Sequence, residues 1–207
     1  MEDDRGIKVV LLGEAGVGKT NLIRVSTGKE FEKNENSTIS SAYYENEDII
    51  NNKPYLYCLW DTAGQEIYRS LNKIFIKDSK IVIIVFAINN KLSFEQIDFW
   101  FNYVRDILGN DGYVIALVAN KSDLFEFQEI SDKEMNKKAV ELGVKIKITS
   151  AAVDAVGFKG FLHELLKDYI DKYKPEEVKQ PETFKINIEN NEDKNEGENG
   201  KQKKKCC

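Results

Sequence analysis

Short apolar runs alternate with longer amphipathic segments along most of the chain, between Ile7 and about Tyr173. The apolar runs are rich in Val and Ile, which is typical of strands that are buried on both faces. The five expected strands of this kind are Ile7–Leu12, Tyr55–Trp60, Ile81–Ala87, Tyr113–Ala119 and Val144–Thr149. Strands that alternate with helices predict an α/β fold with a mostly parallel sheet.

The segments between these runs have helical patterns. From Ser93 onward, apolar residues recur at three- and four-residue spacing, which predicts one helix. Ser131 and Glu134 match a capping box, and Gly143 is a natural end for the helix that follows. A last helix has an apolar stripe of Phe161, Leu162, Leu165, Leu166, Tyr169 and Tyr173.

A hairpin and a polar tail complete the expected organisation. Residues Tyr43–Asn51 and Tyr55–Trp60 flank Asn-Asn-Lys-Pro, which predicts a short hairpin loop and a sixth strand. From Lys174 apolar residues become sparse and Glu, Asn and Lys dominate, so we expect disorder there. The predicted divisions are an N-terminal extension (1–6), a folded domain (7–173) and a tail (174–207).

Composition narrows the protein class. The chain has 207 residues, of which 42% are hydrophobic and 31% are charged. This composition is typical of globular proteins. Its N-terminus, Met-Glu-Asp-Asp-Arg, lacks the apolar segment of a signal peptide, and a cytosolic protein is therefore expected. The net charge of −5 argues against nucleic acid as a partner. We expect Cys58 to be a buried thiol and His163 a surface residue.

The strongest motif lies between the first strand and the helix expected near Lys19. Residues 13–20, Gly-Glu-Ala-Gly-Val-Gly-Lys-Thr, match the phosphate-binding pattern G-x-x-x-x-G-K-[ST]. Gly13 and Gly18 allow the backbone to turn so that successive N–H groups point at phosphate oxygens. Lys19 supplies a charge to the β- and γ-phosphates, and the Thr20 hydroxyl is suited to bind Mg²⁺. Asp61, at the end of another apolar strand, is a candidate carboxylate on the metal side.

With these motifs, the chain resembles the Ras superfamily over about residues 7–173, and the resemblance implies a G domain with a six-stranded sheet. It implies that Gly64 senses the γ-phosphate, that Gln65 orients the attacking water as the catalytic residue, and that Thr38 reaches Mg²⁺ in the triphosphate state. The implied metal ligands are Thr20, Thr38 and Asp61. The implied phosphate contacts are Glu14, Ala15, Gly16, Val17, Gly18, Lys19, Thr20, Thr38 and Gly64.

A base-recognition motif follows the fourth apolar run. Asn120-Lys121-Ser122-Asp123 resembles the N-K-x-D of this family. The Asp123 carboxylate can accept hydrogen bonds from both N1–H and the N2 amine of guanine, and adenine lacks that amine. The resemblance also implies an edge-on aromatic contact with the base from Phe31. It implies base contacts by Ser150, Ala151 and Ala152, although the family usually has Lys at the last position.

Several features are similar to the Rab branch. Thr62–Leu71 is close to the Rab pattern, and Tyr43, Trp60 and Phe75 match the aromatic triad that faces effectors. The sequence Ser-Thr-Ile-Ser-Ser-Ala-Tyr is nearest to endosomal Rabs. Cys206 and Cys207, after three lysines, match a Rab prenylation signal and would give stable anchoring through two lipid chains.

The Rab resemblance implies a GTP/GDP switch in membrane trafficking, on the cytoplasmic face of endosomal or other vesicular membranes, with a cytosolic pool. It implies an exchange factor, a GTPase-activating protein, a GDP-dissociation inhibitor, a Rab escort protein with geranylgeranyltransferase, and effectors as partners. Two alternatives remain open: a GTP-binding module with negligible hydrolysis, because Ala15 stands beside the γ-phosphate position, and a metabolic enzyme such as a nucleotide kinase. Ser40, Ile67 and Ala87 also depart from the usual Rab residues.

Overall fold

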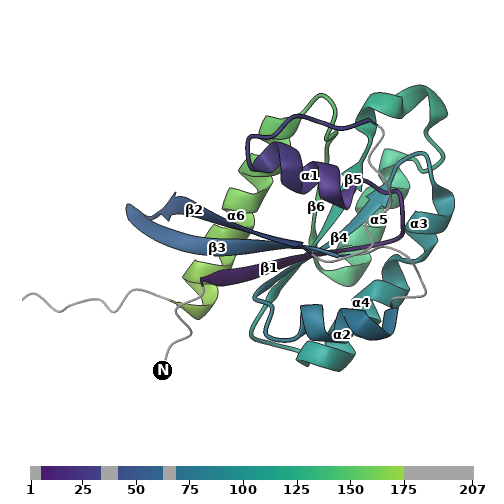
Figure 1. Cartoon of the computed structure of the whole chain (residues 1–207). Coiled ribbons are helices and arrows are strands. Elements are labelled where there is room, and N and C mark those ends of the chain that lie inside the picture. Colours follow the sequence, from purple (N-terminus) through teal and green to yellow (C-terminus); the bar gives the residue numbers. More distant parts are fainter. Residues whose placement is uncertain (1–5, 34–41, 63–68, 175–207) are drawn as a thin grey trace, which may run out of the picture. The chain divides into compact units, whose positions relative to one another are not determined.

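One six-stranded sheet, in the order β2-β3-β1-β4-β5-β6, forms the centre of the fold (Figure 1). The computed structural model describes residues 6–33, 42–62 and 69–174, with the backbone alone for 69–72. The strands are β1 (Ile7–Leu12), β2 (Ala42–Ile50), β3 (Lys53–Asp61), β4 (Ile81–Ala87), β5 (Val114–Asn120) and β6 (Lys145–Ile148). The pairing of β2 with β3 is antiparallel and the other four pairings are parallel. The predicted mostly parallel, six-stranded α/β sheet is therefore confirmed.

Helices cover both faces of this sheet (Figure 1). They are α1 (Lys19–Ser26), α2 (Arg69–Ile76), α3 (Lys91–Glu95), α4 (Ile97–Leu108), α5 (Asp132–Leu142) and α6 (Ala155–Tyr173), with a 3₁₀ helix η2 (Ser122–Phe127). Alternate residues of β1 point to opposite faces, as the two-residue period of a strand requires. Val9 and Leu11 therefore join one core, and Val10 and Leu12 join the other.

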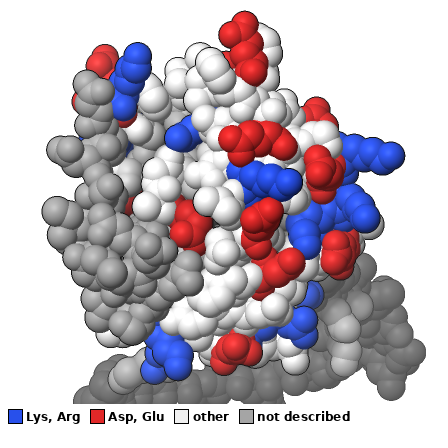
Figure 2. Space-filling view, turned by 90° about the vertical axis from the view of Figure 1, so that its right-hand side faces the viewer, with Lys and Arg blue, Asp and Glu red and all other residues white. Residues whose placement is uncertain are grey.

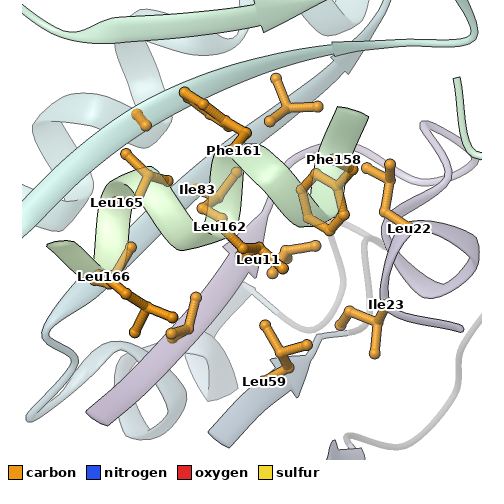
Figure 3. Packing of buried hydrophobic residues seen from close by; sticks show 14 of the residues in the cluster. Leu11, Leu22, Ile23, Leu59, Ile83, Phe158, Phe161, Leu162, Leu165 and Leu166 are labelled. Atoms are coloured by element: carbon orange, nitrogen blue, oxygen red, sulfur yellow. The ribbon is translucent and has the colours of Figure 1, made fainter. Parts of the chain in front are cut away.

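The first core lies between the sheet and helices α1 and α6. Leu22 of α1 and Phe158 of α6 are completely buried there. Truncation of a buried Phe to Ala typically costs about 3–5 kcal/mol, so this packing fixes α1 firmly on the sheet. Figure 3 shows the side chains from both helices and the sheet that meet in this core: Leu11, Leu22, Ile23, Leu59, Ile83, Phe158, Phe161, Leu162, Leu165 and Leu166.

The second core lies on the opposite face. Trp100 and Val104 of α4 and Met135 of α5 are buried against the strands, together with Ile76 of α2. The seven residues of β4 are all buried because both cores use this strand. Such a strand has no solvent-facing side, which explains why its sequence is a continuous apolar run.

The hairpin between β2 and β3 has a two-residue turn. Lys53 and Pro54 belong to β3, and only Asn51 and Asn52 form the turn. Both asparagines have positive φ, 52° and 61°, which is the left-handed conformation that Asn tolerates well. A two-residue turn of this hand matches the twist of the strands, so the predicted hairpin with a short loop is confirmed.

The helix predicted from Ser93 begins earlier and is divided in two. The Asn90 side chain accepts a hydrogen bond from the backbone N–H of Ser93 at 3.0 Å, so the helix begins at Lys91. Gln96 then separates α3 from α4, a break that apolar periodicity alone does not indicate. The prediction for α5 is confirmed. Both hydrogen bonds of the capping box join Ser131 and Glu134 at its start, and Gly143 at its end has the left-handed conformation.

Candidate nucleotide-binding site

The ends of four parallel strands bring the predicted site residues to one edge of the sheet. β1, β3, β5 and β6 run in the same direction, so their carboxyl ends meet (Figure 1). Gly13 follows β1, Asp61 ends β3, Asn120 ends β5, and Ser150 lies two residues beyond β6. Open α/β sheets bind ligands at this edge.

The loop between β1 and α1 requires glycine at two positions. Gly13 has a φ of 135°, and a Cβ atom there would collide with the carbonyl oxygen of Val85 in β4. Gly18, the residue before α1, has a φ of 95°, and a Cβ atom there would collide with the Asn120 side chain. The glycines of the motif therefore allow close contact with neighbouring strands as well as a tight turn.

Lys19 places a buried ammonium group inside this loop. The side chain is 5% exposed, and Nζ donates to the carbonyl oxygens of Gly13 and Glu14, both at 2.9 Å. Burial lowers the pKa of Lys19 to about 8, although the nearby carboxylates of Asp61 and Glu14 favour the charged form. A partly desolvated ammonium of this kind is suited to bind a phosphate group.

Asp61 and Thr62 place the end of β3 beside β1 and Lys19. The Asp61 carboxylate is 2% exposed and lies close enough to Lys19 to affect its pKa. The Thr62 hydroxyl donates to the carbonyl oxygen of Leu11 in β1 at 2.7 Å. Thr20, in the first turn of α1, is partly buried.

Thr20 and Asp61 carry a hydroxyl and a carboxylate oxygen, which are the kinds of oxygen ligand that Mg²⁺ takes in proteins. This ion usually binds one or two protein oxygen ligands and completes its shell with water and phosphate. Within residues 6–33, 42–62 and 69–174, no cluster of three or more His, Cys, Asp or Glu side chains could hold a metal by itself. Thr38, Gly64 and Gln65 were also predicted here, and all three lie outside the described residues.

The Asn120 side chain joins the phosphate loop to the loop after β6. Its Nδ2 atom donates to the carbonyl oxygen of Val17 at 2.8 Å, and its Oδ1 atom accepts from the Ala151 N–H at 3.1 Å. The residue is 1% exposed. A guanine carbonyl at Ala151 would therefore share this N–H donor with Asn120. The sequence reasoning assigned Asn120 to the base and missed its role in connecting the loops.

Lys121 and Asp123 are arranged by the backbone around them. Lys121 has a φ of 65° and a half-buried side chain. This burial lowers its pKa, while the Asp123 carboxylate opposes that shift. The Ser150 hydroxyl donates to Oδ1 of Asp123 and accepts from the N–H groups of Ala152 and Val153. Asp123, Ser150 and Ala152, three of the predicted base-recognition residues, are thus joined by hydrogen bonds.

The backbone next to Phe31 is fixed to α1 by a residue that the sequence patterns did not single out. The buried side chain of Asn21, on α1, donates to the Glu32 carbonyl and accepts from the Glu32 N–H, both at 2.9 Å. Phe31 precedes Glu32 and is 41% exposed, as a side chain that receives a ligand can be. The sequence signal that could have identified Asn21 is a polar residue on the face of α1 that is otherwise buried.

The predicted effector triad is assembled on the outer part of the sheet. Tyr43 of β2 lies opposite Trp60 of β3, and their rings stack with centroids 5.4 Å apart. The Phe75 ring, on α2, lies 6.1 Å from that of Trp60. Lys8 Nζ lies 4.7 Å from the Trp60 ring centroid, a cation–π contact that sequence patterns did not indicate.

The expectations for Cys58 and His163 are both confirmed. Cys58 is a buried free thiol, and His163 is exposed, with Nδ1 2.9 Å from the Asp48 carboxylate.

Figure 2 shows acidic and basic side chains interspersed over the face of the molecule on which α3 lies. In the part of the chain that is described, no helix is both long and apolar enough to span a bilayer.

Comparison with known proteins agrees with this geometry. The family model described as "Ras family" matches residues 8–171. Ras-related protein RABF2a of Arabidopsis thaliana is 34% identical over 160 residues, which cover 77% of this chain and 79% of the relative. The matched region includes every strand of the sheet except the first residue of β1. Both matches favour a GTPase over a nucleotide kinase. The chain belongs to the Ras family and is a Rab-like small GTPase.

Proposed function

We propose that this GTPase cycles between GTP and GDP with the residue roles implied by its motifs. The observation that supports this most strongly is the pair of hydrogen bonds made by Asn120, to Val17 and to Ala151. They make the phosphate loop and the base-recognition loops one connected unit. A nucleotide that bridges them would satisfy both ends of the site.

On the phosphate side, the N–H groups of residues 14–20 surround the α- and β-phosphates and Lys19 binds the β- and γ-phosphates. Thr20, Asp61 and, in the GTP state, Thr38 would hold Mg²⁺. When bound there, the metal would supply positive charge to offset the negative charge of the phosphate oxygens. The Lys19 ammonium already lies against the loop, where it donates to the carbonyls of Gly13 and Glu14.

On the base side, Asp123 accepts hydrogen bonds from the guanine N1–H and N2 amine. The Ser150 hydroxyl donates to the same carboxylate and so fixes its orientation. Lys121 covers one face of the base with its half-buried stem, and the Phe31 ring packs edge-on against the base. Ala151 and Ala152 complete the contact from the loop after β6.

For hydrolysis, Gln65 orients water toward the γ-phosphorus, and Gly64 and Thr38 respond to the γ-phosphate. The attack breaks the bond to the bridging oxygen and yields GDP and phosphate. These roles come from the family resemblance, because the three residues lie outside the described part of the chain. Ala15 is exposed at the loop, where its methyl group would lie near the attacking water and slow the intrinsic rate.

At the membrane, prenyl groups on Cys206 and Cys207 would anchor the protein to the cytoplasmic face of endosomal or other vesicular membranes. Tyr43, Trp60 and Phe75 would face effectors in trafficking. The regulators expected are an exchange factor, a GTPase-activating protein, a GDP-dissociation inhibitor, and an escort protein with geranylgeranyltransferase. The similarity to a protein named Ras-related RABF2a supports this assignment.

Nucleotide released from the purified full chain by denaturation tests the proposal. Chromatography should find GDP or GTP in near-stoichiometric amount and almost no adenine nucleotide. Loading with labelled GTP should then yield GDP in the presence of Mg²⁺. Recovery of adenine nucleotides, or of no nucleotide together with no uptake of GTP or GDP, would overturn the proposed function.

A further inference from the structure

The indole ring of Trp100 contacts the phosphate-binding loop from the far side. Its Nε1 atom donates to Oε1 of Glu14 at 3.2 Å, although 86 residues separate the two in sequence. Trp100 is 2% exposed, so this hydrogen bond lies at the boundary between the second core and the loop. A hydrogen bond from a buried donor to a charged acceptor is worth more than one between neutral groups.

Trp100 is itself held in place by neighbouring aromatic rings on α4. The rings of Phe99 and Tyr103 stack at 5.7 Å, and each makes an edge contact with Trp100, at 5.3 Å and 6.3 Å. α4 also packs against α2. The indole N–H therefore approaches the loop from a rigid support.

The carboxylate that Trp100 holds is within electrostatic reach of Lys19. The backbone carbonyl of Glu14 accepts a hydrogen bond from Lys19 Nζ, and the Glu14 side chain favours the charged form of that ammonium. The same negative charge would repel a polyphosphate bound at Lys19. The repulsion is stronger for a triphosphate, because the γ-phosphate adds charge close to the loop.

We propose that Trp100 is a positioning residue that holds the Glu14 carboxylate away from the phosphates and thereby sustains the affinity for GTP relative to GDP. This inference rests on the proposed function, since it assumes that the loop binds a guanine nucleotide. It gives α4 a role in nucleotide discrimination. Phe in place of Trp100 keeps an aromatic ring but removes the N–H donor, which leaves the carboxylate able to rotate toward the phosphates.

The test compares GTP and GDP dissociation constants, with Mg²⁺, for the full chain and its variants. For Trp100→Phe we expect the affinity for GTP relative to GDP to fall roughly three- to tenfold. Tyr103→Phe, which removes a hydroxyl from the same aromatic cluster, should leave the ratio unchanged. In a Glu14→Gln background the acceptor has no charge, so Trp100→Phe should change the ratio less than about twofold.

Other outcomes separate this role from plain packing. Equal weakening of GTP and GDP in Trp100→Phe, or an effect that persists in Glu14→Gln, would overturn the inference while the proposed function stands. A wild-type chain that binds neither nucleotide would overturn both. Should Trp100→Phe not fold, the indole N–H resonances of the two tryptophans decide the matter. Glu14→Gln and GTP/GDP exchange should both shift the Trp100 resonance, and an unmoved resonance would contradict the inference.

Discussion

Asn120 donates a hydrogen bond from Nδ2 to the carbonyl oxygen of Val17 at 2.8 Å, across 103 residues of sequence. The amide oxygen of the same side chain accepts from Ala151. The phosphate loop, the end of β5 and the loop after β6 thus share one buried side chain. This connection means that the site is largely formed by the fold itself.

Replacement of Asn120 by Ala should destabilise the protein and weaken nucleotide binding together. It leaves the Val17 carbonyl and the Ala151 N–H buried without this partner, which costs about 2–4 kcal/mol. Chemical denaturation should show that loss, and the affinities for GTP and GDP should both fall at least about tenfold. Asn136→Ala, which removes an exposed side-chain bond on α5, is the matched control and should change neither. A stable Asn120→Ala with normal affinity would show that the connection is unimportant.

Gly13→Ala should be far more harmful than the same change at Gly143. Both residues have positive φ, 135° and 67°, but a Cβ atom at Gly13 would meet the Val85 carbonyl, whereas Gly143 has open space around it. Gly143→Ala should cost about 1 kcal/mol through backbone strain. Gly13→Ala should cost at least about 3 kcal/mol, because β1 and β4 must separate to admit the methyl group. Equal thermal shifts in the two variants would argue against the close approach of β1 to β4.

Nucleotide affinity should depend on pH through Lys19. Burial lowers the pKa of its ammonium to about 8. Phosphate oxygens favour the charged form, so this pKa rises on binding, and binding takes up a proton when Lys19 is neutral beforehand. The contribution of Lys19 to affinity is therefore complete below about pH 8 and decreases as the pH rises above it. Calorimetry with GDP in buffers of different ionisation enthalpy should find proton uptake near pH 8.5, a condition chosen about half a unit above that pKa.

Lys19→Arg is the control for this pH dependence. Arg remains charged across the range, so the uptake assigned to position 19 should disappear while titration of the nucleotide itself remains. Identical proton uptake in the wild type and in Lys19→Arg would contradict the assignment.

Membrane association should require the C-terminal cysteines and leave nucleotide binding intact. Cys206→Ser and Cys207→Ser singly should weaken association, because one lipid chain gives reversible binding and a second adds about 0.8 kcal/mol per buried CH₂. The double variant should be recovered in the cytosolic fraction of cells and still bind GTP. A double variant that stayed on membranes at the wild-type level would refute the lipid-anchor proposal.

Much of the fold could be predicted because it depends on local pattern. β4 is a continuous apolar run, and α5 has its capping residues in sequence at Ser131 and Glu134. The β2–β3 turn was harder, since whether Lys53 belongs to loop or strand depends on pairing with Ile50 across the hairpin. The break at Gln96 likewise interrupts neither the apolar period nor the charge pattern.

The site was predictable where one motif contains all its chemistry. The loop from Gly13 to Thr20 is such a case. The contacts of Asn21 with Glu32 and of Trp100 with Glu14 join residues that are distant in sequence or on different elements. Only the folded structure brings these pairs of residues together. In the sequence, Asn21 and Trp100 look like ordinary helix residues.

Competition binding of Asp123→Asn tests the central claim, recognition of guanine by this site, most directly. The Asp123 carboxylate accepts from the guanine N1–H and N2 amine, whereas Asn presents a donor that suits the C2 carbonyl of xanthine. The measurement is the ratio of XDP to GDP affinity for the wild type and for Asp123→Asn. We predict that the wild type prefers GDP and that the preference shifts by at least about a hundredfold toward XDP in the variant. A variant that still prefers GDP as strongly as the wild type does would contradict the account.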